Sequence, residues 1–92
     1  MEDNVYCISY DLRQTGRNYN ELYNAIKSFK SWWHQTESVW FILSNKGAGD
    51  VRDFLMQYLD NNDKLFVIQV MKNWGGKGFS QEEYNWLRGV LK

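Results

Sequence analysis

Three runs of apolar residues, separated by two amphipathic patterns, constrain the fold more than any other feature of the chain. The runs cover residues 5–12, 39–44 and 64–70 and are rich in β-branched and aromatic side chains. Polar or glycine-containing segments bound each run, which is typical of β-strands. Residues 39–44 are apolar on both faces, as expected for a strand in the middle of a sheet. A shorter strand is expected at 32–35, before a tight turn at 36–37.

Two stretches between these runs have apolar residues at helical spacing. Residues 19–29 predict a first helix that ends near Lys30, with Asn18 as its N-cap and Glu21 completing a capping box. Residues 51–59 predict a second helix, with Asp50 as its N-cap.

The last segment predicts a third helix that continues to the C-terminus. Ser80 and Glu83 have the spacing of a capping box, and Phe79 and Tyr84 occupy the positions of a hydrophobic staple. Residues 71–92 therefore form an extension, which begins with the Trp74–Gly78 loop and ends in this helix.

The order of elements predicts an α+β fold of the ferredoxin-like, split βαβ kind with an added C-terminal helix. We expect one domain over residues 1–92, with its core in residues 4–70. The first two helices would cover one face of the sheet and leave the other open. That face is then expected either to meet a second copy or to lie under the final helix, and we favour a homodimer.

Composition limits the function classes. Eleven basic and eleven acidic residues balance, whereas a dedicated duplex-binding protein usually has a basic excess. Cys7 is the only cysteine, so neither an intramolecular disulfide nor a cysteine zinc site is expected. The N-terminus shows no secretory signal, and no run approaches the roughly 20 apolar residues of a membrane span, so we expect a cytoplasmic protein.

Several short motifs together resemble the CRISPR-associated protein two family and its relatives, which include the virulence-associated protein D ribonucleases and small bacterial proteins labelled SinR-like. The motifs are residues 8–12, His34-Gln35 ahead of 38–41, and residues 62–67. The resemblance implies a ferredoxin-like fold, a symmetric dimer and a defence or toxin–antitoxin setting. It also implies, in active members, a divalent metal held with the help of an aspartate at the position of Asp11.

Asp11 is the candidate catalytic and metal-binding residue. It ends the first apolar run, and a dimer axis could bring two copies of its carboxylate together around Mg²⁺ or Mn²⁺. The simpler interpretation is a strand-end carboxylate that hydrogen-bonds the loop at 13–17. His34, the only histidine, could act in acid–base chemistry, although a packing role beside Trp32-Trp33 is the more common one.

Basic and aromatic residues in the loops and at strand ends could form a groove for single-stranded nucleic acid, with phosphates neutralised and bases stacked. The predicted groove residues are Tyr10, Arg13, Arg17, Lys46, Lys72, Trp74 and Lys77. The alternative is ordinary solvated loop charge.

Three functions remain open from the sequence. The first is a dimeric module that binds nucleic acid or a partner protein without catalysis. The second is a metal-dependent endoribonuclease that uses Asp11 from both chains. The third is a protein that binds a small nucleotide in a pocket at the dimer interface, by tryptophan stacking and arginine charge.

Overall fold

A computed structural model of the chain describes residues 2–14 and 16–91. Over these residues the chain forms four strands and three helices. In order they are β1 (Asn4–Asp11), α1 (Asn20–Lys27), β2 (Ser31–Thr36), β3 (Val39–Ser44), α2 (Ala48–Met56), β4 (Lys64–Val70) and α3 (Gln81–Val90). The predicted strands are all confirmed.

The strands form one antiparallel sheet in the order β2-β3-β1-β4. β1 lies between β3 and β4, and its Ile8 is level with Trp40 on one side and Val67 on the other. β3 lies in the interior of the sheet, as its apolar sequence predicts. The structure is therefore a mixed α+β fold with a four-stranded antiparallel sheet.

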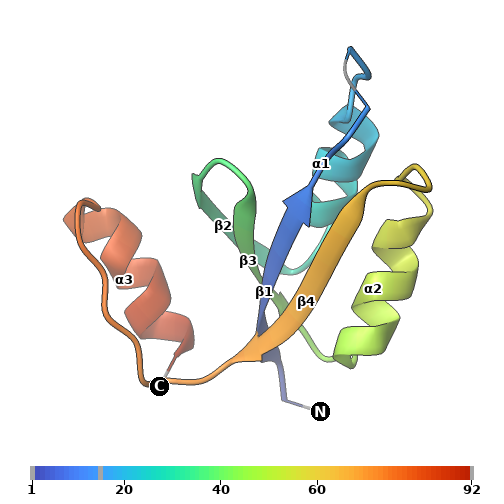
Figure 1. Cartoon of the computed structure of the whole chain (residues 1–92). Helices are drawn as coiled ribbons and strands as arrows, with labels where there is room; N and C mark the ends of the chain where they lie inside the picture. The colour runs from blue at the N-terminus through green and yellow to red at the C-terminus, as the bar shows by residue number, and fades with distance from the viewer. Residues whose placement is uncertain (1, 15, 92) are drawn as a thin grey trace.

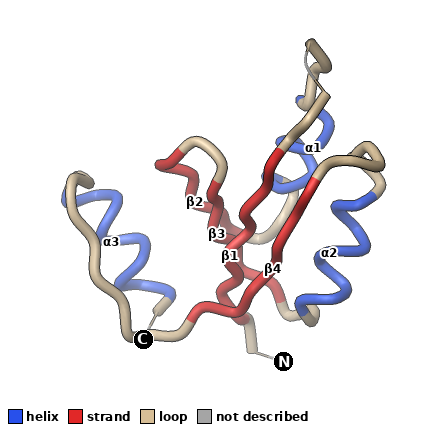
Figure 2. The backbone as a smooth tube through the Cα atoms, in the orientation of Figure 1, coloured by secondary structure: helices blue, strands red, loops and turns tan. Residues whose placement is uncertain are grey.

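The sheet separates α1 and α2 from α3 (Figures 1 and 2). We call the face under α1 and α2 the first face and the opposite one the second face. The main core lies on the first face, where strand and helix side chains exclude water. Its buried members are Tyr6, Ile8, Tyr19, Leu22, Ala25, Ile26, Trp40, Ile42, Val51 and Leu55.

α3 covers only part of the second face. Trp33 of β2 packs between Phe41 and Phe79, with ring centroids 5.2 Å from each. Its Nε1 donates to the carbonyl oxygen of Glu83 at 3.0 Å, and Trp86 Nε1 donates to Ser31 Oγ at 2.8 Å. α3 is thus attached over β2 and β3, and it leaves the β1–β4 half of this face open.

The predicted start of α3 is confirmed. Ser80 Oγ accepts from the Glu83 backbone N–H at 3.1 Å, and the Glu83 carboxylate accepts from the Ser80 N–H at 2.7 Å. Phe79 and Tyr84 meet edge to face, 5.7 Å between centroids. Local sequence is sufficient here because every partner lies within five residues.

The predicted starts of α1 and α2 are wrong. Tyr19 is the N-cap of α1, and Asn18 Oδ1 instead accepts from the Asn20 N–H at 2.9 Å. α2 begins after Gly47, whose carbonyl accepts the first helical hydrogen bond from Val51. Asp50 therefore lies inside the first turn, where its charge still suits the helix dipole. Both helices also end about three residues before their predicted ends.

Candidate functional site

Asp11 lies at the exposed C-terminal end of β1. Its side chain is 54% exposed, and its Oδ2 accepts from Arg13 Nε at 2.9 Å and Nη2 at 2.7 Å. The described part of the chain contains no group of three histidine, cysteine, aspartate or glutamate side chains able to hold a metal ion. A divalent ion at Asp11 would therefore need further donors, such as water or groups of a second chain, and the Arg13 guanidinium already pairs with the carboxylate.

A different carboxylate, Asp63, holds the loop that follows β1. It accepts from the Arg13 backbone N–H at 2.7 Å, the Asp60 N–H at 2.8 Å and the Tyr19 hydroxyl at 2.9 Å. We call these contacts the Asp63 network. Desolvation acts to raise the pKa of Asp63, but the hydrogen bonds outweigh it and hold the pKa below its usual value. Sequence analysis missed this residue because its partners lie up to 50 positions away.

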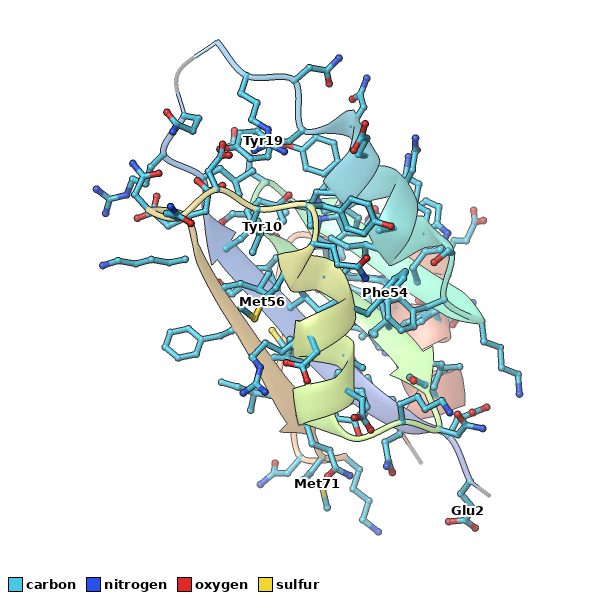
Figure 3. All side chains as sticks on the ribbon, turned by 90° about the vertical axis from the view of Figure 1, so that its right-hand side faces the viewer. Glu2, Tyr10, Tyr19, Phe54, Met56 and Met71 are labelled. Carbon is cyan, nitrogen blue, oxygen red and sulfur yellow. The ribbon has the colours of Figure 1, made fainter. Side chains whose placement is uncertain are left out.

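The structure does not gather the seven predicted groove residues into one groove. Arg13 and Arg17 follow β1, whereas Lys46 follows β3 and Lys72 follows β4. Because β3 and β4 run antiparallel to β1, the two lysines lie at the opposite end of the sheet from the two arginines. Figure 3 shows the same separation, with Tyr19 at one end of the molecule and Met71 at the other.

The two arginines are also engaged within the chain. Arg17 forms an ion pair with Asp60, donates to the carbonyl oxygen of Tyr58 at 3.1 Å and lies over the Tyr19 ring. Arg13 is paired with Asp11. Both guanidinium groups are therefore already engaged with partners within the chain.

Trp74 and Lys77 lie in the connection between β4 and α3. The Trp74 ring stacks on Tyr84 with centroids 6.2 Å apart, so it contributes to the packing of α3, while Lys77 is exposed. The predicted Tyr10 lies elsewhere, on the first face. Its hydroxyl accepts from Trp40 Nε1 at 3.0 Å and donates to the Glu37 carbonyl oxygen at 3.3 Å.

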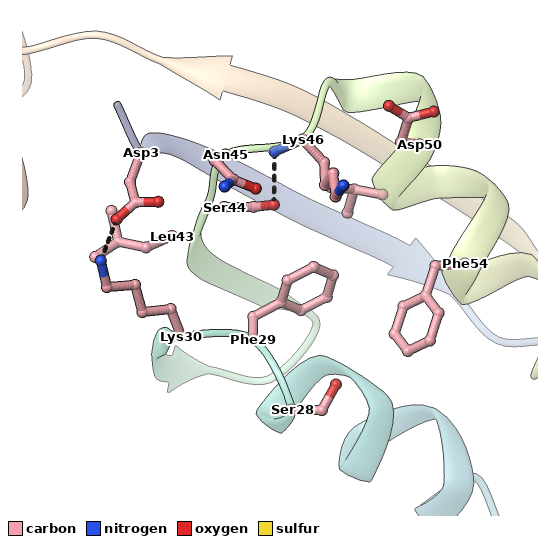
Figure 4. Close-up of a pocket in the computed structure, with 11 residues that line it drawn as sticks. Asp3, Ser28, Phe29, Lys30, Leu43, Ser44, Asn45, Lys46, Asp50 and Phe54 are labelled. Carbon is pink, nitrogen blue, oxygen red and sulfur yellow. Dashed lines mark hydrogen bonds and ion pairs between the residues drawn. The ribbon is translucent and has the colours of Figure 1, made fainter. Parts of the chain in front are cut away.

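A cavity of about 760 Å³ lies between the end of β3, the start of α2 and the loop after α1 (Figure 4). Lys46 lines it, together with Lys30, Asp3 and Asp50. Lys30 forms an ion pair with Asp3 at 2.6 Å. The two lysines and two aspartates cancel, so the lining has no net charge to select an anion.

A smaller cavity of about 260 Å³ has a more distinctive lining. It lies on the first face beside β2, and its walls are Tyr10, Tyr23, Lys27, His34, Glu37 and Trp40. The His34 ring stacks on Trp40 with centroids 3.7 Å apart and planes 10° apart. His34 is therefore a packing residue in this structure, and it also forms part of a cavity wall.

None of the helices within residues 2–14 and 16–91 has the length and apolar character needed to cross a membrane. No protein-family model matches the chain, and the search of solved structures gives no match either. The resemblance to the CRISPR-associated protein two family therefore stays a prediction.

Proposed function

We propose that this chain is one subunit of a homodimer with a ferredoxin-like fold. The dimer binds nucleic acid or a partner protein and has no catalytic activity of its own. The central position of β1, the antiparallel pairing of all strands and the location of α1 and α2 on one face support that fold. The resemblance to the CRISPR-associated protein two family adds a cytoplasmic defence or toxin–antitoxin setting to the same proposal.

The observation that carries the dimer is an exposed apolar strip on β4. Phe66 is 69% exposed and Ile68 is 58% exposed, and both point to the second face, where Cys7 lies level with Ile68. Scattered apolar side chains are normal on a surface, but adjacent large ones beside an open sheet half indicate an interface. We call Cys7, Phe66 and Ile68 the β4 strip.

The outer edge of β4 favours a second copy as the partner. Among the described residues, β4 pairs only with β1, so its other edge offers unpaired backbone groups over seven residues. Two β4 strands that pair antiparallel about Val67 would set Phe66 beside Ile68 of the partner subunit. Aromatic and β-branched side chains opposite each other stabilise such pairs, and the arrangement is symmetric as a dimer requires.

Sedimentation equilibrium tests this interface. Wild-type protein is expected to be a dimer at micromolar concentration, and the double variant Phe66→Lys/Ile68→Lys is expected to be monomeric. Two lysines per chain near the two-fold axis repel each other, so the dimer dissociation constant should rise at least about 100-fold.

The control is Gln35→Lys, which adds a lysine at an exposed position on β2, at the opposite edge of the sheet from β4. It should leave the dimer intact. A wild-type monomer at all concentrations, or a dimer that survives both β4 substitutions, would remove the proposed interface.

A metal-dependent endoribonuclease is the second candidate, because Asp11 lies on the same face as the β4 strip. Side chains alternate along a strand, so Cys7 and Asp11 of β1 share the second face, and Asp11 is level with Lys64 at its end. This candidate requires the second faces of two chains to stack on each other, because antiparallel pairing of two β4 edges about Val67 would leave the two Asp11 carboxylates at opposite ends of the joined strands.

Cleavage of labelled single-stranded RNA in Mg²⁺ or Mn²⁺ tests the second candidate. If the enzyme hypothesis holds, Asp11→Ala should reduce the rate at least about 100-fold, whereas Asp53→Ala on α2 should not. Absence of cleavage by the dimeric wild type supports the binding module, and cleavage that survives Asp11→Ala rules out the role assigned to Asp11.

A further inference from the structure

The cavity beside β2 is the feature that the dimer proposal leaves unexplained. It lies on the first face, whereas the β4 strip lies on the second, so the two can be tested separately. Trp32 and His34 alternate with Trp33 along β2 and therefore point to the first face, next to α1.

Aromatic rings make up much of the lining of this cavity. Tyr23 and His34 both stack on the buried Trp40, at 6.3 Å and 3.7 Å between centroids. Trp32 lies beside the cavity, outside its lining, with its ring tilted against Trp40 at 5.5 Å. Trp32 itself remains 41% exposed. Such partly exposed ring faces beside an open cavity suit a flat, unsaturated ligand.

The polar groups of the wall are held in place. The Glu37 carbonyl oxygen accepts from both the Tyr10 hydroxyl and His34 Nε2, the latter at 3.1 Å. Since Nε2 donates, Nδ1 of the neutral ring is left as an acceptor. Burial raises the pKa of Tyr10, so its hydroxyl keeps its proton at neutral pH.

Lys27 supplies a positive charge at the rim. Its Nζ lies 5.4 Å from the centre of the Trp32 ring, and none of the ion pairs formed by the described residues includes it. The exposed Glu37 side chain belongs to the hairpin on another part of the wall. An anionic group of a ligand is therefore best placed beside Lys27 and Trp32.

We propose that this cavity binds a nucleobase that carries a phosphate, with the base against the rings of Tyr23 and His34 and the phosphate at the rim beside Lys27 and the neighbouring Trp32. The volume of about 260 Å³ lies just below the usual range of ligand pockets and suits one base rather than a larger ligand. Aromatic stacking of bases combined with basic groups at the backbone is also how single strands are held without sequence preference.

The test measures binding by the full chain at about 0.15 M salt, using tryptophan fluorescence and NMR chemical shifts. The probes are adenosine monophosphate and uridine monophosphate as free nucleotides, and a ten-nucleotide oligouridylate as a single strand. Adenosine and ribose 5-phosphate serve as probes that lack the phosphate or the base. We expect the complete nucleotides to bind about tenfold more tightly than either part, with shifts at the Trp32 indole and the His34 ring.

Two variants and one matched control assign the site. Trp32→Leu and Lys27→Met should each weaken binding about tenfold, whereas Lys46→Met, at the other cavity, should change it less than twofold. Comparing the mononucleotides with the oligouridylate also shows whether the ligand is a free nucleotide or part of a single-stranded nucleic acid. A single strand that binds much more tightly than a mononucleotide indicates a nucleic acid, and equal affinities indicate a free nucleotide.

Several outcomes would overturn the proposal. These are no binding of any probe at millimolar concentration, shifts confined to residues outside this cavity, or equal losses for Lys27→Met and Lys46→Met. Because shift mapping uses the wild-type protein, it decides the matter even if Trp32→Leu fails to fold. A monomeric protein that still binds nucleotides would contradict the dimer while leaving this site intact.

Discussion

Replacing Trp40 by alanine is expected to lower the free energy of unfolding by about 3–5 kcal/mol, the largest effect of any single substitution considered. The side chain is 1% exposed and contacts the rings of Tyr23, Trp32 and His34. Its Nε1 also donates to the Tyr10 hydroxyl, which would lose that hydrogen bond. Domains of this size have about 5–15 kcal/mol in total, so the variant should be largely unfolded at moderate urea concentration.

Urea titration at neutral pH, followed by far-ultraviolet circular dichroism, measures this effect. Trp32→Ala is the matched control, because it removes the neighbouring indole from a side chain that is 41% exposed. Its cost should be about 1 kcal/mol. Equal losses for the two variants would show that Trp40 is no more central to the core than its exposed neighbour.

Replacing Asp63 by alanine is expected to lower the free energy of unfolding by about 2–4 kcal/mol at neutral pH. The carboxylate accepts hydrogen bonds from the Arg13 N–H, the Asp60 N–H and the hydroxyl of Tyr19, a buried side chain. Removing it leaves all three donors without their acceptor. The loop after β1 and the loop before β4 would then lose their common attachment.

The cost of Asp63→Ala should also depend on pH. The folded pKa of Asp63 lies below its ordinary value, so its contribution is complete above an unfolded pKa of about 4 and disappears as pH falls through the folded value. The difference from wild type should therefore be constant from about pH 5 to 7 and narrow at more acidic pH. Urea titrations across this range measure it.

Asp53→Ala is the control for Asp63. Asp53 lies on α2, its side chain is 63% exposed, and its ion pair is with the adjacent Arg52. Exposed pairs of this kind contribute little, so the variant should stay within about 0.5 kcal/mol of wild type at every pH. If Asp63→Ala behaves like Asp53→Ala, the Asp63 network does not stabilise the fold.

Local pattern predicted the elements well wherever the partners are near in sequence. The strand at 64–70 has the predicted bounds, and the capping box of Ser80 and Glu83 forms as expected. The start of α2 was missed because Asp50 has a capping side chain but Gly47 supplies the backbone conformation and the first acceptor. Residue type alone does not show which of several possible N-cap residues adopts the extended backbone conformation that begins the helix.

The candidate site was predictable only in part. The position of Asp11 at the end of a strand follows from the sequence, and so does a hydrogen bond to the loop after it, which Arg13 provides. The ring wall around Trp40 was not predictable, because it joins β1, α1, β2 and β3. From the sequence alone, aromatic residues at those positions are as consistent with an ordinary hydrophobic core as with a cavity lining.

The sequence by itself determined the order of strands and helices, the cap of α3 and the placement of polar residues at strand ends, since these depend on periodicity and on contacts within a few residues. Only the tertiary structure decided that β4 is an edge strand with Phe66 and Ile68 exposed, and that α3 covers the other half of that face. The physical reason is that an apolar run predicts that its side chains are buried. Which residues bury them depends on strand pairing between segments that are far apart in the sequence.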